Sequence, residues 1–272
     1  MTLSSAKKKR IADTVDKHLL YQESVQNVEF ELDFIRDRFR EIRGREPYSM
    51  REDFCGTALA SSHWVQQDAE NSAIAVDIDA DVLEWAKGNN LPELDAAERA
   101  RIALIEGNVL DVCNPPVDFI QAFNFSYWCF MDRSTMLDYF TRCHAGLKRD
   151  GVLFLDAYGG SEAYQVQKEK RKVGDFTFIW EQAEFNSVTY EQQCYIHFKF
   201  KDGSKIKRAF SYRWRIWGAR ELREILLDAG FRKVTVYRQA FDEETDEPLD
   251  EYVAGDDATD FACWLGYIVA ER

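Results

Sequence analysis

Between residues 48 and 157 the sequence alternates between short apolar runs and amphipathic stretches, and this alternation restricts the possible folds more than any other feature. The apolar runs predict strands at 48–54, 73–77, 102–105, 119–125 and 151–157. The stretches between them predict helices at 57–67, 81–89 and 134–147. Strands that alternate with helices are joined by right-handed crossovers, so we expect an α/β fold whose mostly parallel sheet carries helices on both faces.

The two flanking regions show different patterns. The N-terminal region is charged and predicts helices at 6–21 and 28–42, the second ending at Gly44. The region after the fifth strand predicts an antiparallel meander with a hairpin turn at Asp202-Gly203 and strands at 176–181, 185–191, 194–201 and 206–213. A helix ending at Gly230 then precedes two closing strands at 231–237 and 264–270, with an acidic loop, 242–260, between them.

These patterns give seven strands in the main sheet and a chain of three parts. We expect an N-terminal helical cap at 1–45, and a sheet domain formed by 46–163 and 218–272. An antiparallel β insert at 164–217 is expected to act as a lid and substrate region.

Charge and composition exclude several classes of protein. The 272 residues include 48 Asp and Glu against 35 Lys and Arg, and this acidic balance argues against nucleic-acid binding. The six cysteines contain no C-x-x-C pair and the four histidines show no metal-ligand spacing, so we expect neither disulfides nor a metal site. No apolar run approaches the ~20 residues of a membrane span, and no secretory signal is recognisable, which favours the cytoplasm.

Polar residues are expected at the carboxyl ends of the first three strands, where open parallel sheets bind ligands. Gly56 lies in the first strand-to-helix turn, where a glycine lets a ligand approach the backbone, although a plain tight turn is the alternative. Asp77 ends the second strand and can accept two hydrogen bonds from a ribose diol, while Asp79 suits the cap of the next helix. Asn108 and Val109 follow the third strand, where an amide and a backbone N–H can bind an adenine edge or simply form a turn.

The order of these features resembles the class I, Rossmann-like, S-adenosylmethionine-dependent methyltransferases. Aligning Cys55-Gly56-Thr57 with the C-G-T often found in that family places Glu52 at its acidic position. Phe54 and Ala58 then replace the first and third motif glycines, which is a departure from the family pattern. The resemblance covers residues 48–160 well and 231–270 more loosely.

The resemblance implies S-adenosylmethionine as the cofactor. Glu52 would meet its amine, Asp77 its ribose and Asn108 its adenine amino group, and Tyr21 would form an aromatic lid unless it is a surface tyrosine. The complete set of expected cofactor-binding residues is Tyr21, Glu52, Phe54, Cys55, Gly56, Thr57, Asp77, Ile78, Asn108, Val109, Asn124, Phe125 and Ser126.

The methyl acceptor is expected near the end of the fourth strand and under the insert. Aromatic rings there can hold a cationic centre, and paired arginines on one strand face can bind a carboxylate, although core packing and solvated arginines are equal alternatives. The expected substrate-binding residues are Tyr127, Trp128, Trp180, Arg213 and Arg215. If the acceptor must lose a proton, Tyr158, His197 or Glu181 is the expected base.

We therefore expect direct methyl transfer to a small-molecule acceptor, accelerated mainly by alignment and by exclusion of water. A homodimer is compatible with the sequence, and neither nucleic acid nor a membrane is an expected partner. Two other functions remain open: a nicotinamide-dependent oxidoreductase on the same type of sheet, and a non-catalytic S-adenosylmethionine-binding protein. The single glycine at the first turn argues against the nicotinamide alternative.

Overall fold

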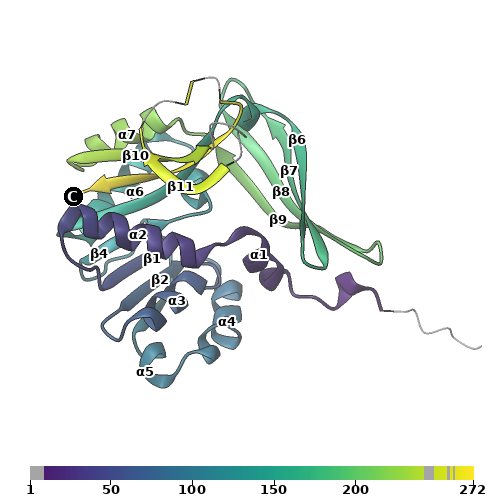
Figure 1. The fold of residues 1–272 in the computed structure, drawn as a ribbon, viewed down its shortest axis with the longest axis horizontal. Coiled ribbons are helices and arrows are strands. Elements are labelled where there is room, and N and C mark those ends of the chain that lie inside the picture. Colours follow the sequence, from purple (N-terminus) through teal and green to yellow (C-terminus); the bar gives the residue numbers. More distant parts are fainter. Residues whose placement is uncertain (1–8, 242–247, 256–257, 260) are drawn as a thin grey trace, which may run out of the picture. The chain divides into compact units, whose positions relative to one another are not determined.

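The computed structural model describes residues 9–241, 248–255, 258–259 and 261–272, which form two compact units (Figure 1). The eight-stranded unit comprises Asn27–Ala163 and Ile216–Arg272, and the four-stranded unit comprises Met1–Gln26 and Tyr164–Arg215. The expected N-terminal cap is thus divided between the two units. No described helix is both long enough and apolar enough to cross a membrane.

The sheet of the eight-stranded unit is mostly parallel, as the sequence predicted. Its strand order is β11-β10-β12-β5-β4-β1-β2-β3, and among the described strands the antiparallel pairs are β11–β10, β10–β12 and β12–β5. The strands are β1 (Ser49–Asp53), β2 (Ser72–Asp77), β3 (Ile102–Glu106), β4 (Val117–Ala122), β5 (Leu147–Gly159), β10 (Lys233–Phe241), β11 (Pro248–Ala254) and β12 (Trp264–Glu271). The expected count of seven is exceeded because β11 forms within the stretch that we interpreted as an acidic loop; residues 242–247, 256–257 and 260 of that stretch lie outside the described residues.

Helices cover both faces of this sheet. They are α2 (Val28–Arg43), α3 (Leu59–Gln67), α4 (Ala80–Gly88), α5 (Ala96–Arg99), α6 (Arg133–Gly146) and α7 (Ala219–Asp228), with short 3-10 turns η2 (Leu91–Glu93), η3 (Ser126–Cys129) and η4 (Ser161–Tyr164). The α2 helix ends as predicted at Gly44, whose φ of 67° favours glycine.

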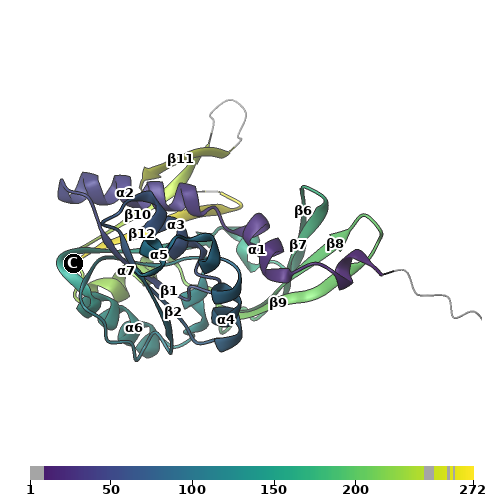
Figure 2. The same ribbon diagram turned by 90° about the horizontal axis from the view of Figure 1, so that it is seen from below.

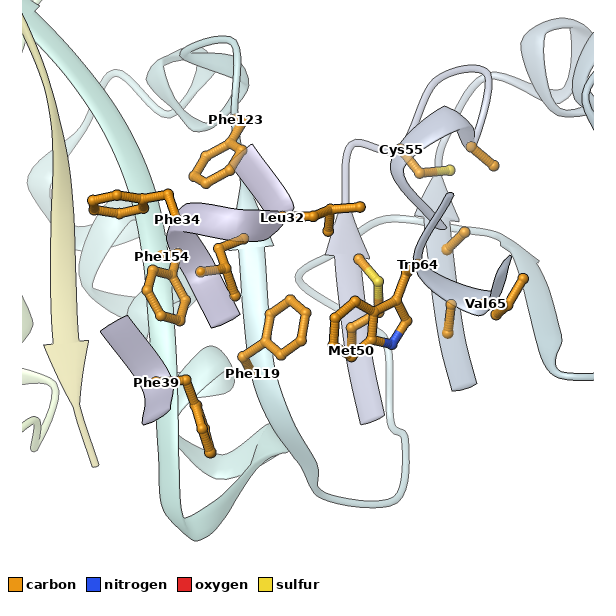
Figure 3. Close-up of a cluster of buried hydrophobic side chains, with 14 of the residues drawn as sticks. Leu32, Phe34, Phe39, Met50, Cys55, Trp64, Val65, Phe119, Phe123 and Phe154 are labelled. Carbon is orange, nitrogen blue, oxygen red and sulfur yellow. The ribbon is translucent and has the colours of Figure 1, made fainter. Parts of the chain in front are cut away.

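One apolar layer explains why α2 lies against the sheet. Leu32, Ile35 and Phe39 recur at helical spacing on α2, and all three are fully buried. They belong to one buried cluster with Phe119 in β4 and Phe154 in β5, and Figure 3 shows Leu32 and Phe39 in the same layer as these two rings. The layer continues through Trp64 of α3, so β1, β4 and β5 are covered by α2 and α3 on this face. We call it the α2 face.

The four-stranded unit is an antiparallel meander with helical segments packed on one side (Figure 2). Its elements are η1 (Ile11–Asp13), α1 (Lys17–Val25), β6 (Gln167–Val173), β7 (Phe176–Phe185), β8 (Glu191–Phe200) and β9 (Lys205–Arg215). Leu20 of α1 packs with Phe198 and other apolar residues of the sheet. The predicted turn at Asp202-Gly203 is confirmed, with Gly203 at a φ of 80°.

Two local predictions for this unit are wrong. Residues 186–190 of the strand expected at 185–191 form the turn between β7 and β8, because the Asn186 side chain accepts hydrogen bonds from the backbone N–H groups of Val188 and Thr189. The single helix expected at 6–21 is instead η1 and α1, because Asp16 caps the start of α1 by accepting from His18 N. Residues 6–8 of that prediction lie outside the described residues.

Candidate functional site

The turn between β1 and α3 has an uncommon backbone for its sequence. Phe54, Gly56 and Ala58 have φ angles of 58°, 52° and 53°, so all three adopt the left-handed conformation. Such a conformation costs about 1–2 kcal/mol for a residue with a side chain. The departure from the glycine motif therefore does not alter the backbone: Phe54 and Ala58 keep the conformation that glycines adopt easily.

Gly56 leaves open space beside this turn. A Cβ atom built on Gly56 would meet no protein atom within 4 Å. The turn leads directly into α3, whose first N–H groups have no partner within the helix and favour an anion such as a carboxylate. Cys55 and Thr57 flank the glycine and are buried, so their side chains pack on the protein side of the turn.

Asp77 connects the ends of β1 and β2. Its Oδ2 accepts a hydrogen bond of 2.7 Å from Gly56 N, and its Oδ1 accepts one of 2.9 Å from Asp79 N. Each oxygen keeps a second lone pair that can accept from a ligand hydroxyl. Asp79 caps α4 through a 3.0 Å bond from Asp81 N, which confirms its predicted role. Ile78, between the two aspartates, is 70% exposed and offers an apolar surface at the end of β2.

The end of β3 lies beside Asp77. Gly107 N donates a 2.9 Å hydrogen bond to the Asp77 carbonyl, which holds the ends of β2 and β3 together. Asn108 Oδ1 accepts a 3.0 Å bond from Leu110 N, so the amide stabilises its own turn, and Val109 is buried next to it. Gly56, Asp77 and Asn108 thus lie at the carboxyl ends of three adjacent strands, as the sequence predicted.

Glu52 is turned towards α3 at the end of β1. Its Oε2 accepts hydrogen bonds of 3.0 Å from Ser61 N and 2.5 Å from Ser61 Oγ. Burial raises the pKa of Glu52 to about 7, and the neighbouring carboxylates of Asp77 and Asp53 add to this increase. Ser61 was not expected from the sequence, because a serine inside a helix gives no distinct signal.

The turn after β4 is held by β5. Asn124 and Phe125 both have left-handed φ angles, 57° and 56°, although neither is glycine. Asp156 of β5 stabilises this turn because its Oδ1 accepts a 2.9 Å bond from Phe125 N, and Tyr127 Oη donates a 2.7 Å bond to the Asp156 carbonyl. Ser126 Oγ donates to the Phe123 carbonyl at 2.9 Å. Burial raises the pKa of Asp156 to about 7.

Aromatic rings fill the space behind this turn. The Tyr158 ring centroid lies 4.7 Å from that of Phe125 and 4.8 Å from that of Trp128. Tyr127 and Trp128, which we expected to bind substrate, are fully buried. Both are core residues that pack behind the turn.

Two further polar residues lie on the α2 face and were not among the expected site residues. Glu31, in the first turn of α2, is half-buried, and burial together with the charges of Asp156 and Glu52 raises its pKa to about 8. Gln121 of β4 is only 2% exposed, and its Oε1 has no hydrogen-bond partner. The sequence signal was present in both cases, because each polar residue interrupts an apolar pattern.

The remaining expected residues belong to the four-stranded unit. Glu181 Oε2 lies 2.7 Å from His197 Nε2, and its Oε1 lies 2.9 Å from Lys168 Nζ. Tyr21 packs on Phe210, with ring centroids 4.8 Å apart. The Trp180 ring packs near that of Trp214, with centroids 5.9 Å apart. Arg213 is exposed and pairs with Glu191, and Arg215 is half-buried.

None of the six cysteines forms a disulfide bond in the described structure. In the described part of the chain, no group of three or more His, Cys, Asp or Glu side chains is placed to hold a metal ion.

Comparison with known proteins identifies this fold. No protein-family model and no curated protein matches the sequence. Among solved structures, an S-adenosylmethionine-dependent methyltransferase from Clostridium acetobutylicum is 14% identical with a TM-score of 0.66, covering 92% of this chain and 96% of its own. The amino pentose methyltransferase CalS10 from Micromonospora echinaspora is 13% identical with a TM-score of 0.64, covering 94% and 95%.

A third solved structure matches over the whole chain. The sugar N-methyltransferase KedS8 from a Streptoalloteichus species is 15% identical with a TM-score of 0.64, covering 100% of this chain and 98% of its own. At these identities the likeness establishes the fold. The chain has the fold of class I S-adenosylmethionine-dependent methyltransferases, and the resemblance found in the sequence is confirmed at that level.

Proposed function

We propose that this protein is an S-adenosylmethionine-dependent methyltransferase that acts on a small-molecule acceptor. The observation that carries the proposal is the β1–α3 turn, where Gly56 lies open in a left-handed backbone and donates its N–H to Asp77 at 2.7 Å. This arrangement fits the cofactor, because it combines an uncrowded backbone at the end of β1 with a carboxylate at the end of the neighbouring strand, where a ribose can bind. The names of CalS10 and KedS8, an amino pentose and a sugar N-methyltransferase, support a small acceptor.

Each part of the cofactor has residues suited to hold it. The methionine carboxylate would bind at the Gly56 turn and the start of α3, and the ribose hydroxyls would donate to the free lone pairs of Asp77. Ile78 would cover a face of the adenine, with Asn108 and Val109 at its edge. When bound, the cofactor supplies a methyl group on a positively charged sulfur.

The turn after β4 would position the acceptor. Its two left-handed residues, Asn124 and Phe125, are held by the Asp156 carboxylate and by the Tyr158 ring, so their backbone groups are fixed before a ligand arrives. Fixed groups lose little entropy on binding, and alignment of the reacting atoms is the main requirement of methyl transfer. No covalent intermediate with the protein is needed.

Binding of S-adenosylhomocysteine, measured by calorimetry, tests the cofactor assignment. We expect Asp77→Asn to weaken binding at least about tenfold, because the ribose loses a charged acceptor. Asp79→Asn is the matched control, since asparagine also caps helices and should leave affinity unchanged. If the unaltered protein shows no binding at high micromolar concentration, or shows a melting shift with NAD alone, the proposed function is wrong.

Catalysis requires a separate experiment. Cell extract incubated with the protein and isotopically methyl-labelled S-adenosylmethionine should yield a labelled small molecule that mass spectrometry detects. A protein that binds the cofactor yet labels no molecule in any extract would instead be a non-catalytic cofactor-binding protein.

A further inference from the structure

Three carboxyl groups on the α2 face of the eight-stranded unit lack a cationic partner. Glu31, Glu52 and Asp156 come from α2, β1 and β5, and none of them forms an ion pair with a Lys, Arg or His side chain among the described residues. Leu32, next to Glu31, packs in the same buried cluster as Met50 of β1 and Phe154 of β5, and the charges of Asp156 and Glu52 both raise the pKa of Glu31. A buried carboxyl group without a cationic partner tends to keep its proton, and a cation that arrives from outside would favour its ionised form.

Gln121 provides an independent sign that a donor is missing. It is directly paired with Glu52 across the β1–β4 ladder, so the two side chains leave the same face of the sheet. Phe119 and Phe123, two residues to either side, pack in the cluster that contains Leu32, the neighbour of Glu31 (Figure 3). Gln121 therefore points towards α2 and the carboxyl groups, and its buried Oε1 has no donor in the described structure.

The chemistry of this group restricts the missing ligand. Carboxylate and amide oxygens accept hydrogen bonds, and one oxygen of Glu52 is already bonded to Ser61. Tyr267, opposite Asp156 across the β5–β12 ladder, has its hydroxyl hydrogen-bonded with Tyr252. The side chains are not arranged to enclose a metal ion. A ligand with several N–H donors and a positive charge satisfies these groups best.

We propose that Glu31, Gln121 and Asp156 form a subsite for a primary or secondary ammonium group, with Glu52 adding negative charge. The inference builds on the proposed function, because the ammonium can come either from the methionine end of the cofactor or from an amine acceptor. Half-buried Glu31 is the member that solvent reaches, so it would meet the ligand first. Asp156 also holds the turn after β4, and this links the ammonium to the groups that position the acceptor.

The experiment compares Glu31→Gln with Glu29→Gln, an exposed residue two positions earlier in α2. Calorimetry measures S-adenosylhomocysteine, which carries the ammonium, and 5′-methylthioadenosine, which lacks it. A third titration adds cyclohexylamine to protein saturated with S-adenosylhomocysteine. Loss of a charged hydrogen bond is expected to weaken the affected ligand by about tenfold or more.

The outcomes separate the two sources. If Glu31→Gln weakens S-adenosylhomocysteine but not 5′-methylthioadenosine, the subsite holds the cofactor ammonium. If it weakens only cyclohexylamine, the subsite holds the ammonium of an acceptor. If all three affinities match those of Glu29→Gln, the proposal is overturned. Failure of the unaltered protein to bind either nucleoside would instead overturn the proposed function.

A second variant guards against misfolding of the first. Gln121→Leu removes the unpartnered acceptor, so we expect equal or higher stability in urea together with weaker binding of the ligand identified by the Glu31 experiment. Higher stability with unchanged affinity would show that Gln121 has no part in the subsite.

Discussion

The amino end of the parallel sheet and the α2 face at its carboxyl end surround buried carboxyl groups in opposite ways. At the amino end, Asp118 accepts bonds from Lys148 Nζ at 2.9 Å and Arg45 Nη2 at 2.7 Å, and from the backbone N–H groups of Tyr48 and Ser49. Burial alone would raise its pKa, but these bonds lower it to about 2. At the carboxyl end, burial raises the pKa values of Glu31, Glu52 and Asp156 to about 8, 7 and 7.

The backbone shows the same contrast. The left-handed position after α2, near the amino end, is occupied by glycine, whereas Phe54, Ala58, Asn124 and Phe125 take that conformation at the carboxyl end. The Asp118 carboxylate at the amino end thus finds all of its partners within the protein. Buried carboxyl groups with raised pKa values and left-handed backbone at residues with side chains gather where the ligand is expected, and both features are typical of functional sites.

Removing the Asp118 carboxylate should have the largest effect on stability. Asp118→Ala leaves Arg45, Lys148 and two backbone N–H groups without their shared acceptor, and breaking a buried ion pair typically costs about 3–5 kcal/mol. Urea unfolding measures this loss. Asp150→Ala, which removes an exposed partner of the same Arg45, should cost less than about 1 kcal/mol. Equal losses in the two variants would contradict the contrast between the two ends.

Glu31→Gln should change stability by less than Asp118→Ala, and it should stabilise the protein at alkaline pH. Because the folded pKa of about 8 lies above the unfolded value, wild-type protein binds the extra proton only when folded, and this stability is lost as pH rises from about 4.5 to about 8. The groups facing Glu31 are Asp156, Glu52 and Tyr267, and none supplies a positive charge. The variant should therefore melt about 3 °C or more above wild type at pH 8.5 and within about 1 °C at pH 5. A higher wild-type melting temperature at pH 8.5 would show that Glu31 is neutralised by the protein.

Gly56→Ala should have a modest effect on stability and a clear effect on binding. Gly56 and Gly44 both have left-handed φ angles, and a Cβ atom on either meets no protein atom within 4 Å. Alanine at each position should cost about 1–2 kcal/mol, measured by urea unfolding. Only the Gly56 variant should lose affinity for S-adenosylhomocysteine, by about tenfold, because its methyl group takes space meant for the ligand. Equal affinities in the two variants would remove Gly56 from the site.

Features set by local pattern were predictable from the sequence. The strand–helix alternation predicted the parallel sheet. Asp77, Asp79 and Gly56 were placed correctly at its carboxyl edge because the ends of parallel strands meet there. The strand β6 was not predicted, because its alternating lysines, Lys168, Lys170 and Lys172, concealed the strand pattern. Likewise, β11 lies in a stretch whose acidic composition suggested a loop.

The carboxyl cluster could not be assembled from the sequence. Glu31, Gln121 and Asp156 come from elements separated by tens of residues, and only the packing of α2 on the sheet brings them together. Each was visible as a polar residue within an apolar pattern, as Gln121 is between Ile120 and Ala122. Such a residue indicates a buried polar group, but the sequence does not show which other groups surround it.

The two hydrogen bonds that the Asp77 carboxylate accepts affect which parts of a bound nucleoside contribute to its affinity. One carboxylate holds the Gly56 loop and also faces the place expected for the sugar. The loop is therefore rigid before any sugar arrives, and the entropy of ordering it was lost during folding, not during recognition. Substitution of Asp77 should consequently weaken the contacts of the bound molecule at the Gly56 loop as well as at its ribose.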